Sequence, residues 1–136
     1  MKRNTLIFFT LISLFSCNKP GKSGFEKMNG NYTATLYKWT VSTSQEEHYD
    51  TLYNQPGILE VNDDSNLVRF NNIIYTAHNS LKDSRGEDSL YASVMVGRTG
   101  YNITIYKKSK KIKYYESWGA PVGPSRGRTM GEYMKQ

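Results

Sequence analysis

The chain has 136 residues, a formal net charge of +6 and one cysteine. A chain of this length fits a single domain, and one cysteine cannot form an internal disulfide. The sequence contains no nucleophile elbow, no phosphate-binding glycine loop and no paired carboxylates at a catalytic spacing, so we expect a protein that is not an enzyme and uses no cofactor.

Residues 1–16 have the layout of an export signal. Lys2 and Arg3 stand before residues 6–15, LIFFTLISLF, which carry no charge. A positive flank followed by a short apolar run is typical of a secretory signal peptide. Because a membrane span needs about 20 apolar residues, we expect a signal peptide here rather than a membrane span or a buried helix.

The single cysteine closes this segment in the sequence Leu14-Phe15-Ser16-Cys17. With an aliphatic residue at −3 and a small one at −1, the sequence resembles the lipobox of bacterial lipoproteins. The resemblance implies cleavage before Cys17, a diacylglyceryl group on its thiol and a further acyl chain, such as palmitate, on its amino group. Two or three acyl chains anchor a protein stably to a bilayer, whereas one chain does so only marginally.

The residues after the cysteine change in character. Residues 17–24, CNKPGKSG, are small and polar, which predicts a flexible tether in front of a single β domain over residues 25–136. By analogy with lipoproteins, Asn18 rather than aspartate at the second position favours the outer membrane. We therefore expect a lipid-anchored protein of the bacterial cell envelope, which contacts a membrane but no nucleic acid.

Most of the domain alternates between apolar and polar residues with a period of two, which predicts β-strands. These segments are rich in Val, Ile, Thr and Tyr and are separated by turn residues. Residues 129–136 form either a last short strand or a helix. We expect strands at 31–41, 57–61, 66–70, 73–77, 89–96, 101–107 and 111–118, and a weaker strand at 46–53.

Three hairpin turns can be placed by asking which register puts apolar residues opposite one another. A slip of one residue would move every side chain to the other face, so a consistent register supports an antiparallel meander of seven or eight strands. The turns and the pairs that they predict are Asp64-Ser65 (Val61 with Val68, Leu59 with Phe70), Arg98-Thr99 (Val96 with Tyr101, Val94 with Ile103) and Ser109-Lys110 (Ile105 with Tyr114, Tyr101 with Trp118).

An antiparallel meander hides its edges by closing into a barrel or by stacking as a sandwich. The segment FEKMNGNYTATLYKW resembles the opening of the lipocalin family, with Phe25, Gly30 and Tyr32 at the characteristic positions. The resemblance implies an eight-stranded barrel with an apolar ligand cavity. It also implies that an arginine near the C-terminal end, Arg126 or Arg128, packs over the opening aromatic.

The expected binding residues lie on the face that the predicted registers make apolar. The chain has eleven tyrosines and two tryptophans, and those on this face either line a pocket or pack in a half-buried sheet. Glu116 also falls there. A buried carboxylate must be paired or protonated, so Glu116 meets a ligand, pairs with Arg126 or Arg128, or lies at the rim in water. The candidate ligand-binding residues are Tyr32, Tyr101, Tyr114, Glu116 and Trp118.

The charged residues are distributed unevenly. Residues 46–96 are rich in Asp and Glu, whereas residues 97–136 are rich in Lys and Arg. The basic turn KKSKK at 107–111 either protects strand ends from aggregation or contacts anionic headgroups. His48 and His78 lack the spacing of metal ligands, so we expect no metal site.

Together these features favour a binding protein over an enzyme. We expect a β-barrel that is held at the envelope by its lipid and binds an apolar small molecule or lipid. The alternative is an accessory lipoprotein that docks a protein partner in an envelope complex. A hollow interior lined by Tyr and Trp favours ligand binding, whereas a filled core with an exposed aromatic patch favours docking.

Overall fold

The computed structural model describes residues 24–119 and 125–136. The expected signal peptide, Cys17 and the tether as far as residue 23 lie outside the described residues. Within the described ranges a short 3₁₀ helix, η1 (Phe25–Met28), precedes eight strands. The strands are β1 (Gly30–Val41), β2 (Glu47–Asn62), β3 (Leu67–Phe70), β4 (Ile73–Lys82), β5 (Asp88–Val96), β6 (Thr99–Tyr106), β7 (Lys111–Gly119) and β8 (Arg126–Lys135).

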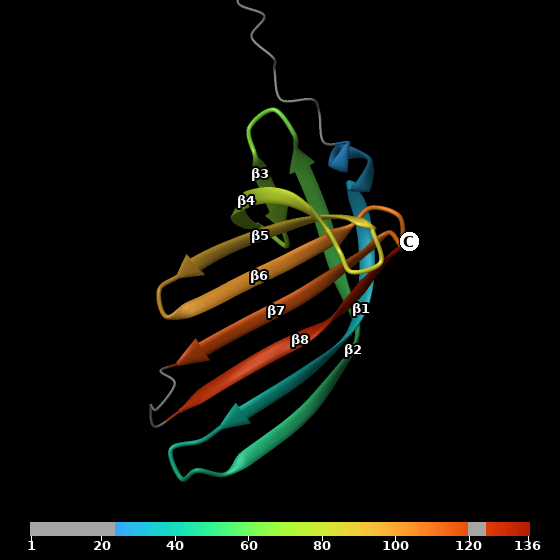
Figure 1. The fold of residues 1–136 in the computed structure, drawn as a ribbon. Helices are drawn as coiled ribbons and strands as arrows, with labels where there is room; N and C mark the ends of the chain where they lie inside the picture. Colours follow the sequence, from blue (N-terminus) through green and yellow to red (C-terminus); the bar gives the residue numbers. More distant parts are fainter. Residues whose placement is uncertain (1–23, 120–124) are drawn as a thin grey trace, which may run out of the picture.

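The strands form one antiparallel meander that closes into a ring. Each strand pairs with the next along the chain, and β8 pairs back with β1, so the sheet is a closed barrel (Figure 1). The predicted all-β meander is confirmed, and closure decides for the barrel over the sandwich. Of the two alternatives for the C-terminal residues, the strand is correct, because β8 covers them.

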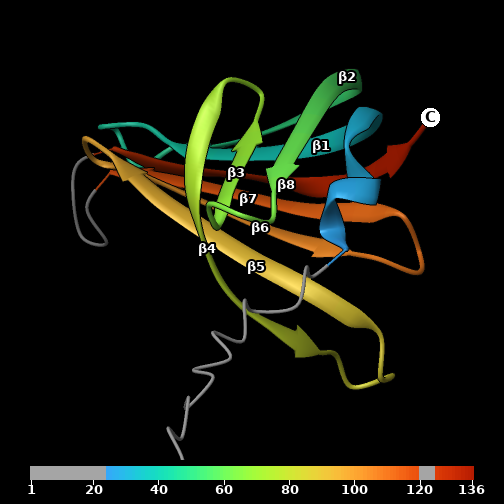
Figure 2. The ribbon, with the colours of Figure 1, turned by 90° about the horizontal axis from the view of Figure 1, so that it is seen from above.

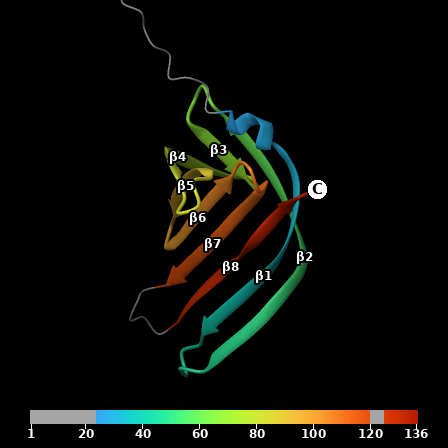
Figure 3. The ribbon, with the colours of Figure 1, turned by 45° about the vertical axis from the view of Figure 1, so that its right-hand side comes forward.

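The ring is uneven, because one of its strands is short. β3 has only four residues and pairs with residues 59–62 of β2 and 73–76 of β4. By contrast, β1 pairs with β8 along residues 32–41. β3 and the start of β4 therefore cross one end of the sheet, next to η1, while β6, β7, β8 and β1 continue past them (Figure 2, Figure 3).

The β2–β3 hairpin has the predicted register. Val61 pairs with Val68 and Leu59 pairs with Phe70, and all four side chains are buried. Asn66, at the end of the turn, has a positive φ of 53°, which asparagine tolerates better than most residues.

The β5–β6 and β6–β7 hairpins have registers that differ from the predicted ones by two residues. Gly97 starts the β5–β6 turn one residue earlier than expected, because it takes a positive φ of 62° at no steric cost. Since side chains alternate along a strand, a shift of two residues keeps each side chain on its predicted face. The pairs that form are Tyr101 with Val94 and Tyr101 with Glu116, in place of Tyr101 with Val96 and Tyr101 with Trp118.

The prediction of separate strands at 46–53 and 57–61 is wrong. These residues form one strand, β2, which continues through Pro56. The register of β2 against β1 shifts between Ala34 and Leu36, and Asn54, close to this shift, has a positive φ of 52°. Such an irregularity lets a proline, which has no N–H to donate, stand within a strand.

The core fills the end of the barrel that β3 crosses. Phe70 of β3 meets Tyr133 of β8 edge-on, with ring centroids 4.9 Å apart. The helix η1 covers this end, where Phe25 and Met28 are buried. The hydroxyl of Tyr32 donates a hydrogen bond of 2.6 Å to the carbonyl of Met28. This end of the barrel is therefore tightly packed.

Candidate functional site

Beyond the packed core, the inner face of the barrel carries a row of side chains from neighbouring strands. Cross-strand pairing sets their order, with Glu116 of β7 between Tyr101 of β6 and Thr129 of β8. We call this the Glu116 row. From β5 to β1 it consists of Val94, Tyr101, Glu116, Thr129 and Lys38.

Glu116 is half-buried and has a single hydrogen-bond partner. Tyr114, on the same strand and face, donates its hydroxyl to Oε2 of Glu116 at 2.9 Å. Among the described residues Glu116 forms no other hydrogen bond and no ion pair. Arg126 and Arg128 lie instead over the ring of Trp39, at 5.8 and 5.0 Å from its centroid. The expectations that one of them pairs with Glu116 or covers the opening aromatic are therefore not met.

A buried tyrosine hydroxyl lies in the same interior. Tyr75 of β4 is fully buried, and its hydroxyl has no hydrogen-bond partner. Burial raises the pKa of Tyr75, and the nearby charges of Tyr101 and Glu116 raise it further. Burial also raises the pKa of Tyr114, and its hydrogen bond to Glu116 adds to the effect. The interior thus holds a half-buried carboxylate on Glu116 and, in the packed core, a tyrosine hydroxyl without a partner.

The two other predicted residues lie in different surroundings. Trp118 lies on the inner face against Gly127 of β8, where an added β-carbon would fall 2.6 Å from the indole nitrogen. A larger residue there would displace the indole. Tyr32 belongs to the core, and burial raises its pKa to about 12. Of the five predicted ligand-binding residues, the barrel gathers four on the inner face and uses Tyr32 for packing.

The outer face of the same sheet carries an open groove of about 1080 Å³. It crosses β1, β2 and β5 to β8, because residues of these strands line it. We call it the outer groove. Its large apolar side chains are Tyr37, Tyr91, Tyr115, Met130 and Met134, and its charged ones are Lys113 and Glu132.

The apolar side chains of the outer groove are open to solvent. Tyr37 is 60% exposed and Met134 is 51% exposed. Tyr91 is oriented by a hydrogen bond of 2.6 Å from its hydroxyl to Oδ1 of Asn102. The groove is therefore a preformed apolar surface with a few fixed polar groups.

The outer groove was not among the sites predicted from the sequence. A usable signal is present in the adjacent apolar pairs Tyr114-Tyr115 and Tyr133-Met134. Neighbouring residues of a strand point to opposite faces, so each pair places one apolar side chain inside and one outside. The pairing of β7 with β8, in which Tyr115 lies opposite Met130, shows that these outer side chains meet on one surface.

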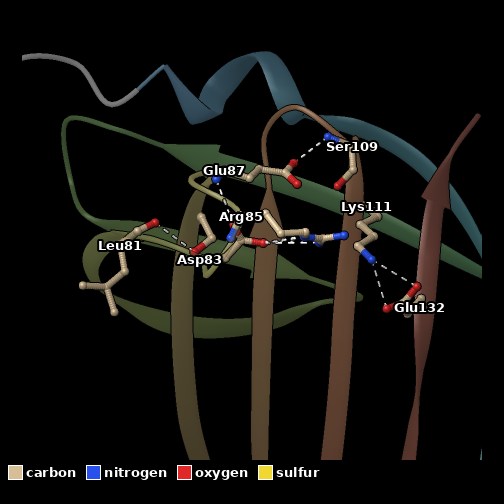
Figure 4. Close-up of polar contacts among 8 residues, drawn as sticks. Leu81, Asp83, Arg85, Glu87, Ser109, Lys111 and Glu132 are labelled. Carbon is tan, nitrogen blue, oxygen red and sulfur yellow. Dashed lines mark hydrogen bonds and ion pairs between the residues drawn. The ribbon is translucent and has the colours of Figure 1, made fainter.

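The charged side chains of the β4–β5 turn form hydrogen bonds within that turn and with the β6–β7 turn. In the β4–β5 turn Asp83 accepts hydrogen bonds from the guanidinium of Arg85 at 3.2 Å (Figure 4). Glu87 accepts one from the backbone N–H of Ser109 in the β6–β7 turn. The backbone N–H groups of Glu87 and Ser109 hold the pKa of the Asp83 and Glu87 carboxyls, respectively, below the usual values.

The basic turn at 107–111 is held by contacts within the fold. The ammonium of Lys107 lies 5.4 Å from the ring centroid of Phe25. Lys111 pairs with Glu132 at 3.2 Å (Figure 4). Whether this turn also contacts anionic headgroups stays a prediction.

Within residues 24–119 and 125–136 no group of three or more His, Cys, Asp or Glu side chains could hold a metal ion. The ring of His78 stacks on that of Tyr91, with centroids 5.3 Å apart, and its Nε2 forms a hydrogen bond with the hydroxyl of Ser93. No helix in this part of the chain is long and apolar enough to span a membrane.

No protein-family model, no curated protein and no solved structure matches the chain. The resemblances to the lipobox and to the lipocalin opening therefore stay predictions from the sequence. The candidate sites are the two faces of one sheet, namely the Glu116 row inside the barrel and the outer groove.

Proposed function

We propose that the protein is a non-enzymatic lipoprotein of the bacterial cell envelope, anchored at the outer membrane through Cys17, whose barrel binds an apolar small molecule or lipid in the outer groove. The observation that supports this function is the gathering of five large, exposed apolar side chains around one recess. Contiguous apolar surface of this kind on a soluble domain marks a binding site.

The size and lining of the outer groove suit a flexible apolar ligand. Pockets for small molecules measure about 300–1,000 Å³, and the groove has about 1080 Å³. Met130 and Met134 follow one another along β8, and methionine adapts to ligands of irregular shape. Lys113 offers a positive charge to a polar headgroup at the side of the groove.

The packing of the interior supports a site on the outside. Phe70, Tyr75 and Tyr133 are at most 2% exposed and fill the core end of the barrel. A filled barrel gives the outer groove a rigid floor, because close-packed interiors resist deformation.

A lipid anchor at Cys17 would keep the barrel close to its ligands. The described chain begins at Gly24, whose N–H donates a hydrogen bond of 2.8 Å to Asp63 in the β2–β3 turn. The stretch from Cys17 to Gly24 reaches at most about 25 Å when extended. The barrel therefore stays within reach of the bilayer surface, where lipids and apolar molecules are concentrated.

Docking of a protein partner is the second candidate function, and the packed core with exposed aromatic side chains outside it is the arrangement expected for docking rather than for a ligand site inside the barrel. The outer groove is open, and Tyr37 and Met134 keep more than half of their surface exposed. Exposed aromatic and methionine side chains are typical of protein interfaces as well as of ligand sites.

Replacing both Tyr115 and Met130 with serine is expected to weaken lipid binding at least tenfold. A fully buried apolar side chain of this size contributes about 1.5–3 kcal/mol, and about 1.4 kcal/mol corresponds to a factor of ten. The measurement is native mass spectrometry of the purified protein, which reports the fraction of molecules that carry a lipid besides the covalent anchor.

Ile74→Ser is the matched control, because Ile74 is 53% exposed but lies outside the outer groove. This variant should keep the lipid. Equal lipid loading of the double variant and the wild type would contradict the groove as the lipid site. A co-purified protein that the double variant loses would instead support docking.

A further inference from the structure

The pairing of the strands sorts side chains of the outer groove into two parallel rows. Residues that face one another across antiparallel strands lie side by side, with Cβ atoms about 4.5–5.5 Å apart. The first row, which we call the polar row, runs from β6 to β1 and consists of Thr104, Lys113, Glu132 and Thr35. The second, which we call the apolar row, runs from β7 to β1 and consists of Tyr115, Met130 and Tyr37. All members of both rows line the outer groove.

Lys113 carries the unbalanced charge of the polar row. Glu132 lies opposite Lys113 in the pairing of β7 with β8, but both of its carboxylate oxygens accept hydrogen bonds from the ammonium of Lys111, at 3.2 and 3.3 Å. The ion pairs of the described residues do not include Lys113. Its ammonium lies 5.5 Å from the ring centroid of Tyr106. Two ammonium groups thus share one carboxylate, which leaves one positive charge beside the groove.

A hydroxyl group lies next to this charge. Thr104 of β6 faces Lys113 of β7 across the strands, and no hydrogen bond among the described residues uses the Thr104 hydroxyl. An ammonium and a hydroxyl at facing positions can donate to the same anionic group, and hydrogen bonds that involve a charged partner are the stronger class. The polar row therefore offers two donors to an anion.

The apolar row begins two residues along β7 from Lys113, at Tyr115. Two residues of a strand span about 7 Å, and neighbouring strands lie about 4.8 Å apart. The three side chains of the row therefore form an apolar strip that crosses three adjacent strands. Tyr115 is 38% exposed, Met130 36% and Tyr37 60%. A positive charge beside such a strip matches a molecule with an anionic end and an apolar chain.

We propose that the outer groove selects an amphiphile with an anionic headgroup, which accepts hydrogen bonds from the ammonium of Lys113 and the hydroxyl of Thr104. The chain of the amphiphile lies along the apolar row. This inference rests on the proposed function, because it takes the outer groove as the binding site, and it names the class of ligand. A cationic amphiphile with the same chain is repelled by Lys113.

Calorimetric titration of the purified protein with decanoate, decylammonium and 1-decanol separates the headgroup from the chain. The three probes share an apolar chain and differ in charge. Decanoate is expected to bind about fivefold or more tightly than decylammonium, because one headgroup is attracted by an exposed ammonium and the other is repelled. Decanol has no charge and reports on the apolar row.

Lys113→Gln removes the charge and keeps a polar side chain. It is expected to weaken decanoate binding about fivefold and to leave decanol binding unchanged. Thr104→Val keeps the shape of the side chain and should weaken decanoate binding about threefold. Lys108→Gln is the matched control, because it removes the same charge at an exposed position of the β6–β7 turn outside the groove. This control should bind decanoate as the wild type does.

The outcomes distinguish the headgroup from the groove. Equal binding of decanoate and decylammonium, or unchanged decanoate affinity in Lys113→Gln, would overturn the anionic headgroup. An equal loss in Lys108→Gln and Lys113→Gln would overturn it too, since net charge and not contact would then set the preference. If decanol still binds and the double serine variant of Tyr115 and Met130 loses it, the groove remains the binding site. If none of the three probes binds, the groove and the headgroup fail together.

Discussion

Phe70→Ala is expected to lower the free energy of unfolding by about 3–5 kcal/mol. The ring of Phe70 is fully buried. It lies 4.9 Å from the ring of Tyr133 and 6.1 Å from that of Tyr114, centroid to centroid. Its removal leaves a cavity in the core and takes away the side chain by which the shortest strand packs against β7 and β8.

Urea denaturation followed by tyrosine and tryptophan fluorescence measures this loss. Leu67→Ala, on the same strand, is the matched control, because Leu67 is 45% exposed. Its expected cost is below about 1 kcal/mol, as is usual for surface positions. Equal losses in the two variants would show that the buried side chain of Phe70 does not hold β3 in the closed sheet.

Cys17→Ser is expected to abolish membrane association. The resemblance to the lipobox implies that the thiol of Cys17 carries the diacylglyceryl group, and serine has no thiol to accept it. Each methylene of a buried acyl chain contributes about 0.8 kcal/mol to anchoring, so loss of the chains removes the whole anchor. Partition between aqueous and detergent phases measures the change, and recovery of the variant in the detergent phase would refute the anchor.

Asn18→Asp is the matched control for the anchor. By analogy with lipoproteins, this change affects sorting between the two membranes and not acylation. The variant should therefore stay in the detergent phase and move towards the inner-membrane fraction. An Asn18→Asp protein in the aqueous phase would mean that residue 18, and not the lipid alone, decides membrane association.

The face on which each residue lies was predictable from the sequence, because the apolar pattern has a period of two and a strand has the same period. Ile103, Tyr114 and Glu116 lie on the predicted face although their partners differ from the predicted ones. The partners were not predictable, since a shift of two residues leaves the pattern unchanged. Closure into a ring depends on the pairing of β1 with β8, between residues far apart in the chain.

The candidate sites were predictable in part. Glu116 among aromatic side chains follows from strand alternation alone, and the barrel does place it beside Tyr101 and Tyr114. The unpaired hydroxyl of Tyr75 could not be inferred, because the absence of a hydrogen-bond partner depends on which side chains pack around it in the interior. The outer groove could not be inferred either, since its lining depends on the order of six neighbouring strands.

The brevity of β3 has a consequence for the dynamics of the barrel. Detaching a strand of four residues breaks fewer backbone hydrogen bonds than detaching any of the longer strands, so local unfolding is expected to begin there. The seven other strands can stay paired while the ring opens into a curved sheet with two free edges. A molecule could then reach the interior without global denaturation, and the amide hydrogens of β3 should exchange with solvent sooner than those of β6 and β7.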